Sequence, residues 1–347
     1  MTEMKFGILG AARIAAGALI PAIKKASNAQ VAAVAARDAG RAAAYASEHG
    51  IPKSYGSYDE MLADPEIDAI YNPLPNSEHM PLSIRALKAG KHVICEKPFT
   101  MNAAEAVQLE EVSRRTGRQV MEAFMWRFHP QVQQVKDAIS SGQIGNVRLL
   151  RSSFSFTMGN QEDIRMVKSL GGGALYDIGT YCVSGFRTFM GREPVSVFAQ
   201  QNLTPSSHIA GGGIDEDMTG VLDFGDGVRA IFDCSFAQPF VQRLEIVGSS
   251  GSITLLDPWV PGRDKNGKDQ GHGGAAPNLL LNGQDFPSAA ADQYQLMVEH
   301  FVRAARGEEA LRFPVSDSIK QMKVLDALFA SAGGAGVVKL YSGFGNG

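Results

Sequence analysis

The sequence predicts an α/β protein whose first part is a doubly wound parallel sheet and whose second part is an α+β domain built on a mostly antiparallel sheet. Through about residue 125, short apolar runs alternate with longer helical patterns, which is typical of parallel strands covered by helices on both faces. Further along, strands follow one another directly and helices stand apart, which indicates antiparallel pairing. A chain of 347 residues also exceeds one ordinary domain. We therefore expect two domains, 1–124 and 125–347.

The elements of the first part have clear local signals. Apolar runs predict strands at 5–10, 31–36, 68–72, 92–95 and 119–123. Amphipathic or alanine-rich segments between them predict helices at 38–49, 78–89 and 102–116, and each is followed by a glycine, the residue most common just past a helix end. The third helix begins at Asn102 with Glu105 three residues later, which is the spacing of a capping box.

The second part has a different order of elements. A helix at 130–141 precedes a strand at 146–156, and the glycine run 171–173 leads into a helix that ends at Gly191. Strands are expected within 195–203, 218–236 and 243–256, and the second segment folds back at Asp226-Gly227, a dipeptide typical of two-residue hairpin turns. Residues 257–290 are rich in Gly, Pro and charge and are expected to form a long surface loop. A final helix is expected at 318–332.

Composition excludes several classes of function. The net charge of -3 gives no electrostatic reason to expect nucleic acid or an anionic membrane as a partner. No apolar run approaches the roughly 20 residues that span a bilayer, and no signal peptide is evident. The three cysteines, Cys95, Cys182 and Cys234, lack a CxxC spacing, which argues against disulfides or structural zinc and suits the cytoplasm.

The first strand leads into a candidate cofactor loop. Gly10, Ala12 and Ala15 occupy the positions of the three small residues of the dinucleotide fingerprint, where the first allows a tight turn and the second lets the backbone approach the pyrophosphate. With them, Ala11, Arg13 and Ile14 are expected to contact the cofactor. Because two of the three small residues are alanine, the motif alone leaves open a simple strand–helix turn without a ligand.

The end of the second strand favours NADP over NAD. NAD-binding folds usually carry an acidic residue there, whereas this chain has Arg37, with Arg41 one helical turn further on. Arginine at this place can bind a 2′-phosphate. Asp38 lies between them, and its alternative role is to cap the next helix.

Two stretches could supply the chemistry. Glu96-Lys97-Pro98 follows a buried strand at the carboxyl end of a parallel sheet, where ligands bind in such folds. In the second stretch, Asp177 and Tyr181 are four residues apart, so a helix places them on one face. Free tyrosine and lysine both titrate near about pH 10, so a lysine ammonium near the phenol would help it to act as a base. Each residue alone has an ordinary alternative as an exposed or amphipathic side chain.

At this point the chain resembles a known family. The stretches GILGAARIA, NPLPNSEHMPLSIRALKAGKHVICEKP, EAFMWRFHP and GGGALYDIGTY are similar to those of the glucose–fructose oxidoreductase / inositol dehydrogenase (Gfo/Idh/MocA) family. The resemblance runs over nearly the whole chain and is weakest in 257–290. It implies an NAD(P)-dependent dehydrogenase or reductase acting on CH–OH groups, an N-terminal Rossmann domain and a C-terminal domain with a large open sheet. That sheet commonly mediates assembly, so a homodimer or homotetramer is expected.

The resemblance also implies roles for particular residues. Many members have histidine where this chain has Tyr181, and tyrosine there resembles the branch of NADP-dependent D-xylose dehydrogenase and dihydrodiol dehydrogenase. Lys97 would be catalytic, with Arg165 as a substrate-side residue. The remaining expected cofactor contacts follow the fourth strand, the fifth strand and the start of the second domain: Pro73, Leu74, Asn76, His79, Glu96, Lys97, Trp126 and Arg127. His79 could otherwise bind a metal, but no second ligand has suitable spacing, and we expect no metal.

The resulting hypothesis is an NADP-dependent oxidoreductase that transfers a hydride between the nicotinamide and a hydroxyl or carbonyl carbon. Lys97 polarises the reacting oxygen, Tyr181 relays the proton and Asp177 holds a substrate hydroxyl. Together with Arg165 they would bind a hydroxyl-rich small molecule, so an aldose or ketosugar is favoured over a trans-dihydrodiol. Two alternatives stay open: a non-catalytic dinucleotide-binding sensor, and redox-assisted hydrolysis or epimerisation with retained cofactor.

Overall fold

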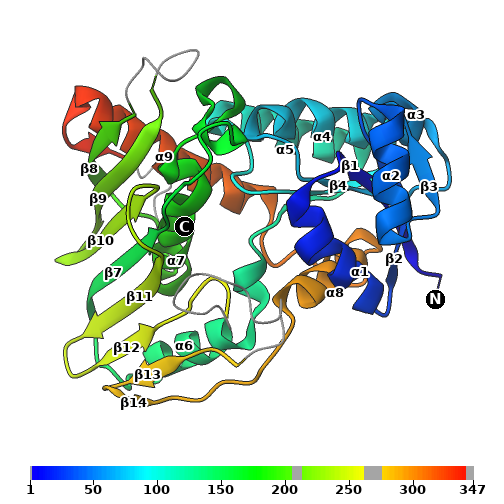
Figure 1. Cartoon of the computed structure of the whole chain (residues 1–347). Coiled ribbons are helices and arrows are strands. Elements are labelled where there is room, and N and C mark those ends of the chain that lie inside the picture. Colours follow the sequence, from blue (N-terminus) through cyan, green and yellow to red (C-terminus); the bar gives the residue numbers. More distant parts are fainter. Residues whose placement is uncertain (1, 205–212, 262–275, 341–347) are drawn as a thin grey trace. The chain divides into compact units, whose positions relative to one another are not determined.

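The computed structural model describes residues 2–204, 213–261 and 276–340. These residues form two compact units (Figure 1). The first contains the chain up to Phe128 together with Asp292–Ile319, and the second contains His129–Ala291 and the chain from Lys320 on. The sequence pattern did not predict that residues Asp292–Ile319 return to the first unit.

The first unit is built on a six-stranded parallel sheet with the order β3-β2-β1-β4-β5-β6. Its strands are β1 (Met4–Leu9), β2 (Ala29–Ala35), β3 (Lys53–Tyr55), β4 (Ala69–Asn72), β5 (His92–Cys95) and β6 (Val120–Glu122). This is the Rossmann order, in which the chain reverses direction across the sheet between β1 and β4, and dinucleotides bind beyond the carboxyl ends of strands at such a point. The predicted strands and the predicted fold class are confirmed.

The helices of the first unit are α1 (Ile20–Lys25), α2 (Ala39–His49), α3 (Tyr58–Ala63), α4 (His79–Lys88), α5 (Ala103–Thr116) and α8 (Gln293–Ala305). Of these, α2, α4 and α5 begin and end within one residue of the bounds that the sequence predicted. Asn102 accepts a hydrogen bond from the Glu105 amide at 2.9 Å, and Glu105 accepts one from the Met101 amide at 3.0 Å, which satisfies amides at the start of α5 as a capping box does. The short elements β3 and α3, and the returning helix α8, were not predicted.

The second unit is built on a nine-stranded sheet with the order β14-β13-β12-β11-β7-β10-β9-β8-β15. Its longer strands are β7 (Val147–Ser155), β8 (Ser196–Leu203), β9 (Asp215–Gly225), β10 (Val228–Ser235) and β11 (Val241–Gly248). The shorter ones are β12 (Ser252–Leu255), β13 (Leu279–Leu281), β14 (Gln284–Asp285) and β15 (Val338–Lys339). Among the described strand pairs of this second sheet, only β7 and β10 pair in parallel. The sheet is therefore mostly antiparallel, as predicted.

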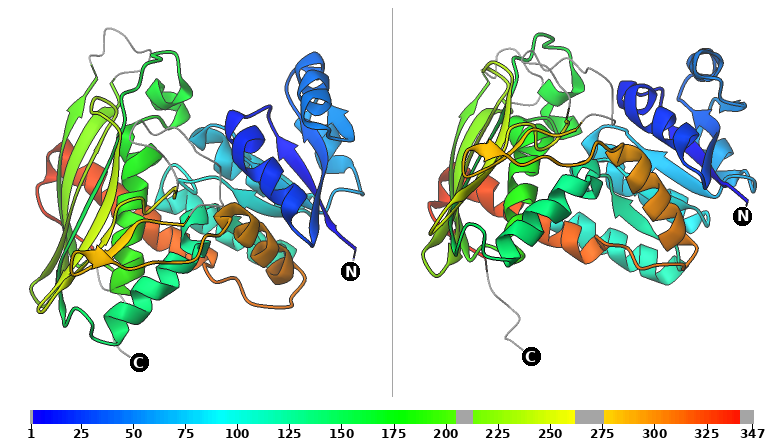
Figure 2. Two further views of the ribbon diagram at one scale, coloured as in Figure 1. Left: turned by 60° about the horizontal axis from the view of Figure 1, so that its bottom comes forward. Right: turned by 90° about the horizontal axis from the view of Figure 1, so that it is seen from below.

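One face of the second sheet is packed and the other is open. Side chains alternate along the strands between buried and exposed, and α7 (Thr180–Met190) packs on one side, against β7 and β10 (Figure 2). On the opposite face, Phe198, Ile231 and Val241 are exposed. The other long helices that the second unit contains in whole or in part are α6 (Pro130–Ser140) and α9 (Val315–Ala330).

The expected surface loop at 257–290 was wrong for several of its described residues, whereas residues 286–290 form neither helix nor strand and are at least partly exposed. Trp259 has no exposed surface, and Leu279–Leu281 pairs with β12 as an added strand. Asn282 and Gly283 both have positive φ, 54° and 78°, and turn the chain back into β14. An Asn-Gly dipeptide after three leucines is a hairpin signal that composition alone obscured. Residues 262–275 of the expected loop lie outside the described part of the chain.

Candidate functional site

Gly10 has the conformation that the fingerprint requires. Its φ is +79°, and a Cβ there would lie 2.8 Å from Cδ2 of Leu74, so a larger residue would be both strained and blocked. Its amide donates to the Ala35 carbonyl at 2.7 Å, which ties the end of β1 to the end of β2. Ala15 is fully buried, whereas Arg13 and Ile14 are exposed. The loop can therefore receive a pyrophosphate, and the lack of a side chain at Gly10 fits the predicted cofactor.

Both arginines lie beside this loop. Arg37 is exposed at the end of β2, and Arg41 donates from Nη2 to the Ala11 carbonyl at 3.2 Å. Asp38 caps α2, because its Oδ1 accepts from the Arg41 amide at 2.6 Å, which was its alternative role. Burial raises the pKa of the Tyr58 phenol, whereas the charges of Arg37 and Arg41 lower it, so this ring lies near both guanidinium groups.

His79 does not lie on the surface of the expected cofactor site. It has no exposed area, and its Nδ1 and Nε2 lie 2.7 and 2.9 Å from the carbonyl oxygens of Pro98 and Leu74. Burial lowers the pKa of His79 to about 4. His79 therefore joins the segment after β4 to the segment after β5, and its expected cofactor contact stays a prediction. Pro73 is also buried, whereas Leu74 and Asn76 are partly exposed.

Glu96 and Lys97 lie at the carboxyl end of β5, as predicted, and both are partly exposed. The hydroxyl of buried Tyr71 on β4 donates to Glu96 Oε1 at 2.7 Å, and the Lys97 amide donates to Glu96 Oε2 at 3.3 Å. The peptide bond between Lys97 and Pro98 is cis. Because Tyr71 holds the Glu96 carboxylate, the backbone that carries Lys97 is held with it. No sequence pattern distinguishes Tyr71 from an ordinary strand residue.

Trp126 and Arg127 are packed into the first unit. Trp126 has no exposed surface, and the Arg127 side chain is 8% exposed. Arg127 forms an ion pair of 2.6 Å with Asp317, and its guanidinium lies 3.5 Å from the ring centroid of Phe313. These contacts bind Arg127 to the returning segment of the chain, and the expected cofactor contact of Trp126 and Arg127 stays a prediction.

In the second unit, Arg165 and Asp177 form an ion pair. Arg165 Nε lies 2.8 Å from Asp177 Oδ2, and its Nη1 lies 3.2 Å from Oδ1 of Asp163. The Asp177 carboxylate raises the pKa of Arg165. The expected substrate-side arginine and the expected aspartate are therefore neighbours. Asp163 was not predicted, although it lies in the same Asp-Ile-Arg stretch.

The glycine run brings the Arg165 segment against the helix that carries Asp177. A Cβ on Gly172 would lie 2.3 Å from the Arg165 carbonyl oxygen, and a Cβ on Gly173 would lie 1.9 Å from Asp215 Oδ1. Gly173 donates to that same Arg165 carbonyl at 2.9 Å, and Leu175 donates to Asp215 Oδ2 at 2.6 Å. Asp215 is buried, and burial raises its pKa to about 7. No local pattern identifies Asp215, because its role depends on a contact across 40 residues.

Asp177 and Tyr181 lie on consecutive helical turns of different type. Leu175–Gly179 is a π-helical turn that continues into α7 at Thr180. Such turns are rare and are often found at functional sites. Tyr181 is 7% exposed and packs between Phe154 and Trp259, with ring centroids 5.6 and 5.7 Å away. Lys97 belongs to the first unit, whereas Asp177 and Tyr181 belong to the second.

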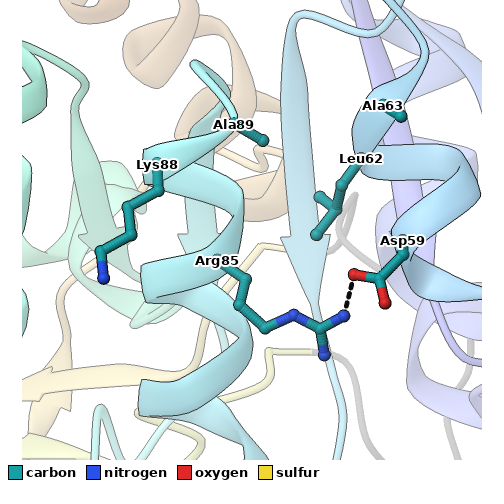
Figure 3. A pocket seen from close by; sticks show the side chains of 6 residues that line it. All are labelled: Asp59, Leu62, Ala63, Arg85, Lys88 and Ala89. Atoms are coloured by element: carbon teal, nitrogen blue, oxygen red, sulfur yellow. Dashed lines mark hydrogen bonds and ion pairs between the residues drawn. The ribbon is translucent and has the colours of Figure 1, made fainter.

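A surface groove lies apart from these residues. It has a volume of about 330 Å³ between α3 and α4 and is lined by Asp59, Leu62, Ala63, Arg85, Lys88 and Ala89 (Figure 3). Arg85 and Asp59 form an ion pair across it. None of the residues predicted to form the site lines this groove, so we assign the groove no role in the predicted hydride transfer.

In the described part of the chain, no group of three or more His, Cys, Asp or Glu side chains could hold a metal ion. None of the described helices has the length and hydropathy of a membrane span.

Two family descriptions match the chain. Residues 4–124 match an oxidoreductase family with an NAD-binding Rossmann fold, and residues 132–254 match the GFO/IDH/MocA C-terminal domain. D-xylose 1-dehydrogenase (NADP(+)) 2 of Haloferax volcanii is 35% identical over 343 residues, which cover 97% of this chain and 100% of that protein. Trans-1,2-dihydrobenzene-1,2-diol dehydrogenase of Xenopus tropicalis is 36% identical over 265 residues, which cover 74% and 77%.

A solved structure shares the whole fold. The crystal structure of a 3-ketoreductase from Actinomadura kijaniata, in complex with NADP and TDP-benzene, superposes with a TM-score of 0.87. It is 29% identical in sequence, and the match covers 95% of this chain and 98% of that one.

Proposed function

Because the chain belongs to the Gfo/Idh/MocA oxidoreductase family, as its motifs predicted, we propose that it transfers a hydride between NADP and a small sugar or polyol. The reacting group is a hydroxyl or carbonyl carbon, and an aldose or ketosugar is the favoured substrate. The observation that carries this proposal is the intact Lys97, Asp177 and Tyr181 set, with Asp177 paired to Arg165. A non-catalytic sensor would be expected to have lost part of that set.

The choice of NADP rests on the basic residues at the end of β2. Arg37 is exposed there and Arg41 lies beside the loop, so two guanidinium groups can bind a 2′-phosphate. At the end of β2, NAD enzymes usually carry an acidic residue that binds the ribose hydroxyls, whereas this chain has Arg37. The neighbouring Asp38 caps α2. The name of the xylose dehydrogenase includes NADP(+), and the crystal structure of the 3-ketoreductase contains NADP, which supports the same choice.

Each proposed catalytic residue has a defined task. When bound, NADP supplies the hydride acceptor for alcohol oxidation. Lys97 donates a hydrogen bond to the reacting oxygen and favours its negative charge. Tyr181, in its phenolate form, accepts the proton from that oxygen and becomes a phenol. Asp177, held by Arg165, accepts a hydrogen bond from a neighbouring substrate hydroxyl and orients the sugar. Glu96, held by Tyr71, fixes the backbone of Lys97. Carbonyl reduction follows the same steps in reverse.

A trans-dihydrodiol is the second candidate substrate. Phe154 and Trp259 surround Tyr181, and the two rings are stacked with centroids 6.5 Å apart. An aromatic surrounding of the proton-transfer group suits an arene-derived diol. The trans-dihydrodiol dehydrogenase of Xenopus tropicalis is among the relatives and supports this candidate.

We further propose a cytoplasmic homodimer or homotetramer. The open face of the nine-stranded sheet carries the exposed side chains Phe198, Ile231 and Val241. Apolar groups gathered on one face indicate an interface with another chain. All three cysteines are buried free thiols, which suits a reducing compartment.

The test is a fluorescence titration with NADPH and NADH, followed by NADP+ reduction against a panel of aldoses and a trans-dihydrodiol. We expect tighter binding of NADPH than of NADH, and turnover that depends on a sugar. Turnover on the dihydrodiol alone would make that compound class the substrate. NADPH binding without turnover on any compound of the panel would contradict the proposed substrate classes.

A further inference from the structure

The candidate cofactor loop is bound to α2 by two side chains. Arg41 Nη2 donates to the carbonyl oxygen of Ala11 at 3.2 Å, and the Tyr45 hydroxyl donates to the carbonyl oxygen of Ala12 at 2.8 Å. Arg41 and Tyr45 are four residues apart and therefore share one face of the helix. Two consecutive carbonyl groups of the loop are thus bound by one face of a neighbouring helix.

The orientation of these carbonyl groups matters for an anion. Amides of a loop that receives a pyrophosphate must point toward it, and carbonyl oxygens that turned the same way would repel its charge. Buried or ordered carbonyl groups also need hydrogen-bond donors. Arg41 supplies such a donor to the Ala11 oxygen. Tyr45 supplies a second donor to the Ala12 oxygen, which also accepts from the Ala16 amide at 3.2 Å. Both side chains bind these oxygens from the α2 side of the loop.

The two donors are themselves held in place. Asp38 accepts from the Arg41 amide at 2.6 Å and so fixes the first turn of α2. The Tyr45 ring lies against His49 with centroids 4.4 Å apart and an edge-on geometry. Burial raises the pKa of Tyr45 to about 12, and the nearby Glu48 acts in the same direction, so the hydroxyl keeps its proton at every working pH.

From this geometry we propose that Arg41 and Tyr45 are positioning residues that hold the loop ready for the pyrophosphate, which NADP and NAD share. This rests on the proposed dinucleotide function and deepens it. Arg41 has a double role, because the guanidinium group has five N–H donors and can bind both the loop and a 2′-phosphate. Arg37 binds the 2′-phosphate alone. Tyr45 binds the loop alone.

These assignments predict different patterns of affinity for two coenzymes. Tyr45→Phe removes one hydroxyl and keeps the ring, so we expect NADPH and NADH to bind roughly three- to tenfold more weakly, by the same factor for both. Arg37→Ala is expected to weaken NADPH and leave NADH unchanged. Arg41→Ala is expected to weaken both, and NADPH more strongly.

The experiment is a fluorescence titration of the full chain and its variants with NADPH and NADH. Tyr55→Phe is the matched control, because Tyr55 donates to Asp64 at 2.5 Å in the same unit and the structure gives that hydroxyl no contact with the loop. It is expected to leave both dissociation constants within twofold of wild type. If Tyr45→Phe does not fold, the exposed Arg41→Ala provides the same test through NADH.

Two outcomes would overturn the proposal. Dissociation constants of Tyr45→Phe within twofold of wild type would remove Tyr45 from the positioning role. A loss for NADPH alone would make Tyr45 a 2′-phosphate contact. If the wild-type protein binds neither coenzyme, the proposed function fails as well, and this result differs from a failure confined to the variants.

Discussion

Replacing Gly172 with alanine should disturb the second unit through a backbone collision. The added Cβ would lie 2.3 Å from the Arg165 carbonyl oxygen, 2.8 Å from the Arg165 carbonyl carbon and 2.9 Å from the Val167 amide nitrogen. Ordinary contact begins near 3.4 Å, so the two backbone segments must separate by about 1.1 Å, the difference between 3.4 and 2.3. No side-chain rotation can relieve this contact, because all three atoms belong to the backbone.

The magnitude follows from two opposing effects. Overpacking of this kind typically costs about 1–3 kcal/mol, whereas replacing glycine by alanine restricts the unfolded chain and stabilises by about 0.4–1 kcal/mol. We therefore expect a net decrease of about 1–2 kcal/mol in the free energy of unfolding. Movement of the Arg165 backbone also displaces its side chain from Asp177, now 2.8 Å away. If the proposed function holds, kcat/KM should fall at least about tenfold.

The matched control is Gly159→Ala. Gly159 also lies outside the positive φ region, and a Cβ there meets no atom within 4 Å. This control should be neutral or slightly stabilising. Urea unfolding followed by tryptophan fluorescence and circular dichroism measures both variants, and the tryptophans Trp126 and Trp259 report on different units. Equal unfolding free energies for the two variants would refute the reasoning, since the collision would then carry no cost.

Three further predictions concern the proposed chemistry and pH. Lys97→Met should lower kcat at least about 1,000-fold while the dissociation constant of NADPH stays within a few-fold of wild type. Single-turnover assays measure the first quantity and titration measures the second. Retained turnover would show that Lys97 does not have the proposed role. Tyr181→Phe should lower kcat about 100- to 10,000-fold and abolish the pH dependence that a tyrosine base imposes, while KM changes little. Burial raises the pKa of Asp215 to about 7, so the folded state retains a proton that the unfolded state releases, and stability should fall as pH rises from about 4 to about 7. In urea unfolding across this range, Asp215→Asn should lack that decrease, and parallel pH profiles would count against a raised pKa.

Much of the first unit could be predicted because its signals are local. Apolar runs of four to seven residues, glycines past helix ends and the Asn102 cap depend on neighbours in the chain, and the structure places β1, β2, β4, β5 and β6 where they indicated. The short β3 and α3 lack enough residues for a periodic pattern. The returning helix α8 packs against α1, a contact that no local pattern encodes.

The candidate site divides in the same way. Gly10, Arg37, Lys97, Asp177 and Tyr181 could be identified from the sequence by itself, because the chemistry of each residue type and its place after a strand or on a helix are visible there. The burial of these side chains could not be predicted, because it depends on every element that packs around each of them. Only the tertiary structure showed that the side chains of His79, Trp126 and Arg127 are buried.

Contacts between distant segments were also decided only by the tertiary structure. Asp215 binds the start of the helical segment that carries Asp177 from 40 residues away, and Tyr45 and Arg41 bind the cofactor loop across about 30 residues. Each is an ordinary polar residue in its own stretch of chain. The sequence by itself determined which groups can do chemistry, and the packing of sheets and helices determined which other groups hold them, because hydrogen bonds of this kind exist only once the strands have been brought together.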